Sequence, residues 1–164
     1  MKRTRKEDDV ARDEEFLQQA IELARANIAK GGRPFGAVVV KNGEVVASSV
    51  NQTFATNDPT DHAEMAALRA ASQALNSSDL RGTTMYASGQ PCPMCVAAMR
   101  IAGVERAVHA YSNDYGAPFG LSNAWLYGEL ANPAAELKMK LEHTNSAHDP
   151  DNGIYADWKR AQPQ

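Results

Sequence analysis

Between residues 13 and 30, apolar side chains recur every three or four positions and polar side chains fill the positions between them. The pattern predicts a helix from an N-cap at Asp13 to about Lys30, ended by Gly31-Gly32. Its apolar stripe recurs every three or four residues: Phe16, Ala20, Ile21, Ala24 and Ile28. Residues 1–12 alternate in charge and carry few apolar side chains, so we expect a flexible leader.

Strand-like runs follow this helix. The runs 36–40 and 45–50 are rich in valine and flank Asn42-Gly43, a pair that favours a tight hairpin turn. Residues 51–60 are polar and predict a loop. Later segments are expected as a helix at 62–75, a strand at 83–87, a helix at 93–102, a strand at 104–110, an apolar-aromatic segment at 124–130, a last strand at 137–141 and a last helix at 153–160. This alternation predicts an α/β fold with a sheet between helices, in one domain spanning 13–164.

Composition narrows the class of protein. The chain has 164 residues, 43% hydrophobic and 23% charged, as in ordinary soluble domains. A net charge of −3 weighs against a nucleic-acid surface, and no apolar run approaches the roughly 20 residues that span a bilayer. The basic start is followed by Glu7-Asp8-Asp9 instead of an apolar stretch, which argues against a secretory signal. We therefore expect a cytoplasmic protein with free thiols.

The two cysteines of the chain, Cys92 and Cys95, stand three residues apart at the expected start of the helix at 93–102. Both sulfurs then point to one side, and a helix N-terminus favours thiolates, which are zinc ligands. Alone, this C-x-x-C fits a thioredoxin-like redox pair equally well. His62 upstream offers a third ligand, although a lone histidine is more often a surface or capping residue.

Glu64, two residues after His62, is the expected proton carrier. Because the two side chains diverge on a helix, Glu64 is better placed to contact a metal-bound water than the metal. It also fits a capping box with Asp61. Three ligands leave one zinc position open, as in catalytic sites, and zinc lowers the pKa of water to roughly 7. A structural site completed by His109, His143 or His148 is the less favoured interpretation.

With these residues in place, the chain resembles the zinc-dependent cytidine and nucleobase deaminase superfamily, whose signature is H-x-E followed by P-C-x-x-C. The segments Gly32-Arg33-Pro34-Phe35-Gly36, Asn57-Asp58-Pro59-Thr60-Asp61-His62-Ala63-Glu64 and Pro91-Cys92-Pro93-Met94-Cys95 are similar to the branch of guanine deaminases and tRNA adenosine deaminases. Clear similarity covers about residues 14 to 111. The resemblance implies a three-layer α/β/α fold around a five-stranded mixed sheet, one zinc per subunit and a homodimer.

Carried over by position, the resemblance implies specific roles. His62, Cys92 and Cys95 would bind zinc and Glu64 would shuttle protons. Asn51 and the Ala63 backbone would contact the base, and Phe35 would line the pocket. In guanine deaminases the C-terminal segment can close the partner subunit's active site, a role that Tyr155 to Gln164 would take here.

Two departures concern the substrate. Gln90 stands where the family usually has Glu, and Gly120-Leu121-Ser122-Asn123 replaces Gly-Phe-Asp-Asp. Asn123 forms hydrogen bonds but cannot titrate as the second Asp does. Tyr111, Asp114 and Trp125 lie in the same variable region and are candidates for shaping the pocket, with core packing the alternative for Trp125.

The expected activity is deamination of a small aminated nucleobase, with guanine to xanthine and ammonia the leading reaction. A tRNA wobble-adenosine deaminase is the second hypothesis, and the acidic balance argues against it. Guanosine, cytosine, a pterin or a triazine would suit the changes at Gln90 and Asn123. A non-enzymatic zinc or redox protein is the remaining alternative, and Glu64 argues against it because a structural site has no use for that carboxylate.

Overall fold

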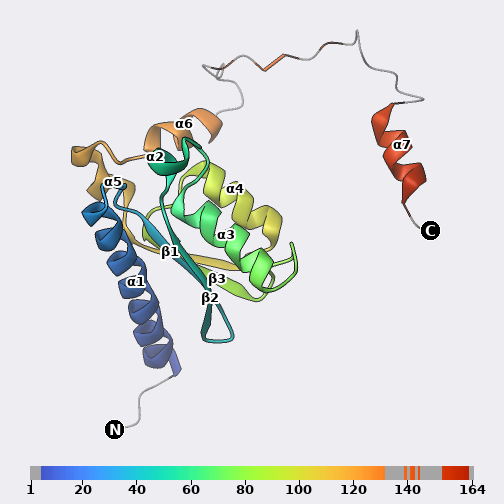
Figure 1. Ribbon diagram of the computed structural model, residues 1–164. Helices are drawn as coiled ribbons and strands as arrows, with labels where there is room; N and C mark the ends of the chain where they lie inside the picture. Colours follow the sequence, from blue (N-terminus) through green and yellow to red (C-terminus); the bar gives the residue numbers. More distant parts are fainter. Residues whose placement is uncertain (1–4, 132–138, 140, 143, 145–152, 163–164) are drawn as a thin grey trace. The chain divides into compact units, whose positions relative to one another are not determined.

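A computed structural model describes residues 5–131, 139, 141–142, 144 and 153–162 (Figure 1). Residues 1–128 and 129–164 form two compact units. The elements, in chain order, are α1 (Arg5–Ala29), β1 (Gly36–Lys41), β2 (Glu44–Val50), α2 (Thr53–Thr56), α3 (Ala63–Ala74), β3 (Thr83–Gly89), α4 (Pro93–Ala102), β4 (Arg106–Tyr111), α5 (Asn113–Gly116), the 3-10 turn η1 (Ala117–Phe119), α6 (Ala124–Ala131) and α7 (Ile154–Ala161). No helix within the described ranges is long and apolar enough to cross a bilayer.

The sheet of the first unit is mixed, in the order β2-β1-β3-β4. Strand β1 runs antiparallel to β2 and β3, whereas β3 and β4 are parallel. At the β1–β2 turn Asn42 and Gly43 have φ of 53° and 80°, as the predicted tight hairpin requires.

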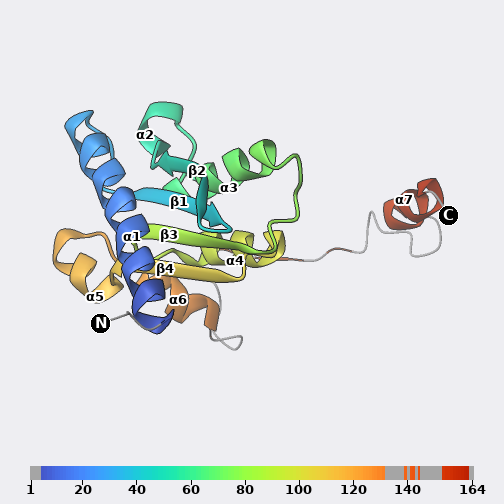
Figure 2. The same ribbon diagram turned by 90° about the horizontal axis from the view of Figure 1, so that it is seen from below.

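Helix α1 covers one face of the sheet, and α3 and α4 cover the other (Figures 1 and 2). Alternating side chains of β1 are buried in the two clusters on these faces. Val38 and Val40 pack with Phe16 and Ala20 of α1. Ala37 and Val39 pack in the second cluster, which holds the buried residues of α3 and α4. The predicted α/β architecture, with the sheet between helices, is therefore confirmed.

The sheet has four strands in the described part of the chain, and the expectation of five is wrong there. After β4 the chain turns into short helices, because Ser112 caps α5 and Pro118 suits the following 3-10 turn. The expected strand at 137–141 falls largely outside the described residues, and Met139 and Leu141 are not in a strand.

Two helix starts also differ from expectation. Helix α1 begins at Arg5, before Asp13, because the charged residues ahead of it are good helix formers. Asp13 is not an N-cap: its carboxylate accepts hydrogen bonds from Tyr86 and Arg106. The polar segment expected as a loop contains the single turn α2.

Four chain segments meet at one end of this sheet. Strand β1 begins there at Gly36, and β2, β3 and β4 end there at Val50, Gly89 and Tyr111. The segments that follow β2 and β3 lead into α3 and α4. Loops anchored at such an end can hold side chains in fixed positions around one crevice.

Candidate metal centre and active site

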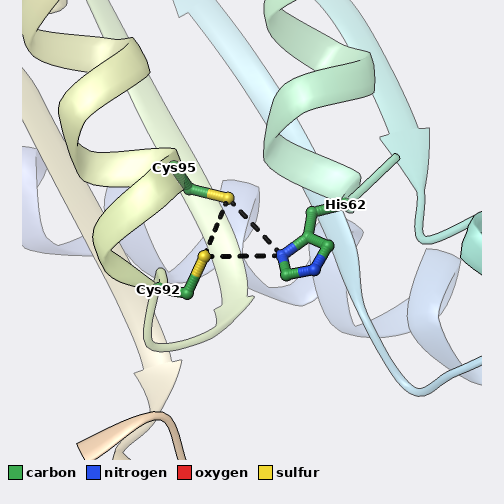
Figure 3. A group of neighbouring side chains, drawn as sticks. All are labelled: His62, Cys92 and Cys95. Atoms are coloured by element: carbon green, nitrogen blue, oxygen red, sulfur yellow. Dashed lines mark hydrogen bonds between the residues drawn. The ribbon is translucent and has the colours of Figure 1, made fainter. Parts of the chain in front are cut away.

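His62 and Cys92 are the N-cap residues of α3 and α4. Both have extended backbones, and neither side chain caps its own helix, so both are free to turn toward each other. Cys95 lies in the first turn of α4 and is fully buried. Pro93 occupies the first turn of α4, where a backbone N–H would have no partner within the helix and where proline, which lacks that N–H, is favoured. The three side chains converge in the space between the two helix starts (Figure 3).

The distances within this triad fit a zinc ion. Nδ1 of His62 lies 3.5 Å from Sγ of Cys92 and 3.7 Å from Sγ of Cys95, and the sulfurs are 3.6 Å apart. A tetrahedral zinc, at roughly 2.3 Å from sulfur and 2.0–2.1 Å from nitrogen, separates its ligand atoms by about 3.5–3.8 Å. The donor set and its spacing therefore match three corners of a zinc tetrahedron. Within the described residues it is the only such group of three.

The electrostatics of the thiols support the same conclusion. The hydrogen bond with Cys95 lowers the pKa of Cys92 to about 4, with His62 adding to the effect. The pKa of Cys95 is raised, first by its hydrogen bond with Cys92 and then by burial. Two sulfurs this close in a buried position favour a divalent cation, which replaces thiol protons when it binds. His62 has a raised pKa because it hydrogen-bonds to Cys92, and the charge of Arg33 opposes that shift.

Glu64 lies beside this triad in the first turn of α3 and is only 7% exposed. Burial raises its pKa, while its own backbone N–H and the charge of His62 act in the opposite direction. The capping-box interpretation is wrong, because His62, not Asp61, occupies the N-cap position of α3, and the Asp61 carboxylate accepts hydrogen bonds from Thr56 and Arg69. Glu64 is thus available for proton transfer.

Asn51 directly follows β2, at the sheet end where β3 and β4 also finish, and is buried. Its Oδ1 accepts hydrogen bonds from the N–H and the hydroxyl of Thr53, and its N–H donates to the Phe35 carbonyl. Its carbonyl accepts from Nδ2 of Asn27, which also donates to the Arg33 carbonyl at 2.8 Å. These contacts leave Nδ2 of Asn51 as the group that can donate to a ligand.

Ala63 and Phe35 are the other two residues expected to contact the base. Ala63 is buried in the first turn of α3, where a backbone N–H has no partner within the helix. The Phe35 ring packs against Gly89, the last residue of β3, so closely that a Cβ there would lie 2.9 Å from it. Both residues therefore lie at the sheet end that holds the metal triad.

Gln90 ties the metal loop to the variable region. Its Oε1 accepts a hydrogen bond from the N–H of Asn113, and Oδ1 of Asn113 accepts one from the N–H of Asn123. A neutral amide at position 90 is thus sufficient to hold the loop. Through Asn113, the same amide is also connected to the backbone of Asn123. Asn113 was not identified from the sequence, where no motif marks it.

The remaining candidates are solvent-facing. Trp125 is 63% exposed, so the core-packing interpretation is wrong. Asp114 and His109 are exposed, and Tyr111 stacks on Tyr115 with ring centroids 4.8 Å apart. His143 and His148 lie outside the described residues.

Tyr127 of α6 is a site residue that sequence reasoning missed. Its hydroxyl donates to the Pro91 carbonyl at 2.5 Å, one residue before Cys92. Burial raises its pKa, and the charges of Cys92, Cys95 and Glu64 act in the same direction, which places the phenol near all three. Only an aromatic residue in an apolar segment marked it in the sequence.

Comparison with known proteins agrees with this geometry. The family described as "Cytidine and deoxycytidylate deaminase zinc-binding region" matches residues 10–111. The chain is 38% identical to a guanine deaminase of Bacillus subtilis over 124 residues, covering 75% of this chain and 80% of the relative. It is 37% identical to a tRNA-specific adenosine deaminase of Aquifex aeolicus over 131 residues, covering 79% and 83%. An X-ray structure of guanine deaminase from B. subtilis superposes with a TM-score of 0.83 at 32% identity, covering 92% and 96%.

The chain therefore belongs to the zinc-binding cytidine and deoxycytidylate deaminase family and is a zinc-dependent aminohydrolase. His62, Cys92 and Cys95 form its potential metal site.

Proposed function

We propose that this enzyme hydrolyses guanine to xanthine and ammonia. The observation that carries the proposal is the triad of His62, Cys92 and Cys95 with the buried Glu64 beside it. Similarity to B. subtilis guanine deaminase over most of both chains supports guanine as the substrate.

In this proposal the triad holds one zinc, which supplies the Lewis acidity that makes water reactive near neutral pH. The carboxylate of Glu64 accepts a proton from the attacking water and delivers it to a ring nitrogen of the base. Water adds oxygen to the carbon bearing the amino group, and that group leaves as ammonia after protonation. The raised pKa of Glu64, caused by burial, suits a group that must both accept and donate.

Neighbouring residues would orient the base. Nδ2 of Asn51 and the N–H of Ala63 are donors and so call for acceptor atoms on the substrate, which the carbonyl oxygen and ring nitrogens of guanine supply. Phe35 would supply the apolar wall. Asn123 would shape the side of the base pocket that faces solvent. Asp114 and Trp125 would do so from farther away.

We also propose a cytoplasmic homodimer, since its thiols must stay reduced to bind zinc and the family resemblance implies two subunits. A tRNA wobble-adenosine deaminase is the second candidate, supported by the identity to the A. aeolicus enzyme. Deamination of another nucleoside or heterocycle is the third, supported by the neutral side chains of Gln90 and Asn123.

Ammonia release from a panel tests the function: guanine, guanosine, adenine, adenosine, cytosine, a pterin and an aminotriazine. We expect guanine to be turned over fastest, and Glu64→Gln to reduce turnover by about 10²–10⁴-fold, the usual contribution of a general acid–base group. Zinc content should stay at one per chain in both proteins. Ammonia release from a different compound would make that compound the substrate in place of guanine. If no compound of the panel releases ammonia, the anticodon stem-loop of a tRNA is the substrate to test next.

A further inference from the structure

A cavity of about 610 Å³ is walled in part by Asn51, and its other lining residues have no role in the chemistry above. The end of α1, the loop that follows it, the end of β2 and the short α2 form its walls. The residues that decide its chemistry are Lys30, Arg33, Asn51, Gln52 and Phe54. It is lined by two cations, amide groups and an aromatic ring.

Arg33, which lines this cavity, contacts two aromatic rings. Its guanidinium carbon lies 5.6 Å from the centre of the Phe35 ring and 5.9 Å from that of Phe54. Cation–π contacts of this kind fix the plane of the guanidinium and leave its N–H edge free. That edge presents a fork of donors which matches the oxygens of a phosphate or carboxylate. Phe54 is 69% exposed, so it is not part of the core, and this contact gives the ring a function.

The two cations of the cavity, Lys30 and Arg33, have no ion-pair partner among the described residues. None of the lining residues of the cavity is acidic. The C-terminus of α1 contributes a negative partial charge to one wall. However, the carbonyls of Asn27 and Ile28 there already accept hydrogen bonds from the N–H groups of residues 30 to 32.

The cavity is connected to the metal centre through its own lining. Asn51, the expected base-binding residue, forms part of the wall. The loop that carries Arg33 is fastened to Asn51 by two contacts, the bridge from Asn27 and the hydrogen bond to the Phe35 carbonyl. The charge of Arg33 also acts on His62. An anion bound in this cavity and a base held at the metal centre would therefore share Asn51 as a neighbour.

We propose that this cavity binds the phosphate group of a phosphorylated nucleoside whose base occupies the zinc site. The inference rests on the proposed deaminase function and extends its substrate class from the free base to a nucleotide. Phe35 and Phe54 keep the guanidinium in position, Arg33 contacts the phosphate through its donor fork, and Lys30 adds charge at the rim. Inorganic phosphate shares this chemistry and is the alternative source of the bound group.

Isothermal titration calorimetry on the full-length, zinc-loaded Glu64→Gln protein, which should bind the base without hydrolysing it, tests the site with guanosine 5′-monophosphate, guanosine and inorganic phosphate as probes. The cavity variants below are made in the same Glu64→Gln background. We expect the nucleotide to bind at least about 10-fold more tightly than guanosine, which is the effect of one charge-assisted contact. Added salt should narrow this gap. Arg33→Gln should remove most of the difference in affinity between nucleotide and guanosine. Lys30→Gln, at an exposed position, should reduce that difference as well, and it serves as the second variant if Arg33→Gln perturbs the loop. Arg25→Gln, which removes an exposed charge outside the cavity, is the matched control and should keep the gap.

Equal binding of nucleotide and guanosine, or a gap that survives both cavity variants, would overturn the proposal. Nucleotide binding no tighter than that of inorganic phosphate would mean a site for the free anion and would overturn the nucleotide assignment. Because calorimetry needs no turnover, these outcomes are separate from guanine deamination. If guanine releases ammonia but the gap is missing, only the cavity assignment fails.

Discussion

At the scale of single residues, the substrate side of the site depends on Asn27 as a positioning residue. Its Nδ2 joins the carbonyls of Arg33 and Asn51, two segments that are not neighbours in the sequence. Gly32 permits this contact, because a Cβ there would lie 2.4 Å from Nδ2 of Asn27. Asn27, on α1, thus fixes the backbone of Asn51 from a distant part of the sequence.

We expect Asn27→Asp to weaken substrate binding more than catalysis. An oxygen in place of Nδ2 would face two carbonyl oxygens, which costs about 2 kcal/mol or more of folding free energy and shifts Asn51. Steady-state kinetics with guanine should show KM raised about 10-fold or more and kcat changed much less, with zinc content unchanged. Asn42→Asp, the same chemical change in the exposed hairpin turn, is the control. An unchanged KM would show that Asn51 holds its position without Asn27.

The sequence was sufficient for the metal ligands and insufficient for the groups that position them. Cys92 and Cys95 are local in sequence, and His62-Ala63-Glu64 is read as one motif. Tyr127 contacts a residue 36 positions away, and Asn27 one that is 24 away. Such contacts depend on how elements pack, and no spacing in the sequence encodes them.

At the scale of elements, Gly36 sets the distance between α1 and the sheet. A Cβ at this position would lie 2.3 Å from the carbonyl oxygen of Ala20 and 2.9 Å from the N atom of Ala24. Both are backbone atoms of a helix, so neither can move without shifting α1 as a whole. The glycine is required by close approach and not by a positive φ.

Gly36→Ala should therefore destabilise the protein by about 2 kcal/mol or more, at the upper end of what overpacking costs. Urea unfolding followed by circular dichroism measures the loss. Gly128→Ala is the matched control, since nothing lies within 4 Å of a Cβ there and an alanine favours helix α6 by about 0.5–1 kcal/mol. Equal stabilities of the two variants would contradict this account of how α1 packs.

Asp13 fastens α1 to the other end of the sheet. Its carboxylate accepts hydrogen bonds from Tyr86 of β3 and Arg106 of β4. The bond from Arg106 is the main cause of its lowered pKa. Because the folded state lowers this pKa, the stabilisation is present above the unfolded value, near 3.9, and is lost as pH falls through the folded value.

Asp13→Asn should cost about 1 kcal/mol of unfolding free energy at pH 6–7, where wild-type Asp13 is charged. The difference between the two proteins should close as the pH falls below about 4. Urea unfolding at several pH values between 3 and 7 measures it. Asp79→Asn, at an exposed carboxylate paired with Arg81, should show no measurable difference, as for most surface pairs. A gap that stays constant down to pH 3 would exclude the charge of Asp13 as its cause.

Predicted and observed ends of an element agree where a proline or a glycine marks the end of a periodic pattern. Helix α4 was predicted correctly because Pro93 and Gly103 mark its ends, and Gly103 adopts a φ of 82°. The start of α1 was misplaced because charged residues support a helix without an apolar stripe. The fifth strand was inferred from resemblance, and no contact among the described residues supports it.

At the scale of the whole molecule, α7 carries apolar side chains that the described residues leave exposed. Ile154, Tyr155 and Trp158 are 76%, 85% and 62% exposed. Apolar side chains gathered on one helix usually mark an interaction surface. The resemblance implies that this segment closes the active site of a partner subunit, which would give these side chains their contact.

Complementation between two inactive chains tests this arrangement. A chain lacking residues 153–164 should keep its zinc, because all three ligands lie in the first unit, but should lose most guanine turnover. Glu64→Ala keeps α7 and lacks the proton carrier.

After subunit exchange, half of the dimers are mixed, and in these α7 of the Glu64→Ala chain can close the site of the truncated chain. Activity should then rise to about a quarter of wild type, since one site in four is complete. Mixing without exchange is the control. A mixture no more active than its components would show that α7 does not cross between subunits, and full activity of the truncated chain alone would remove α7 from the site altogether.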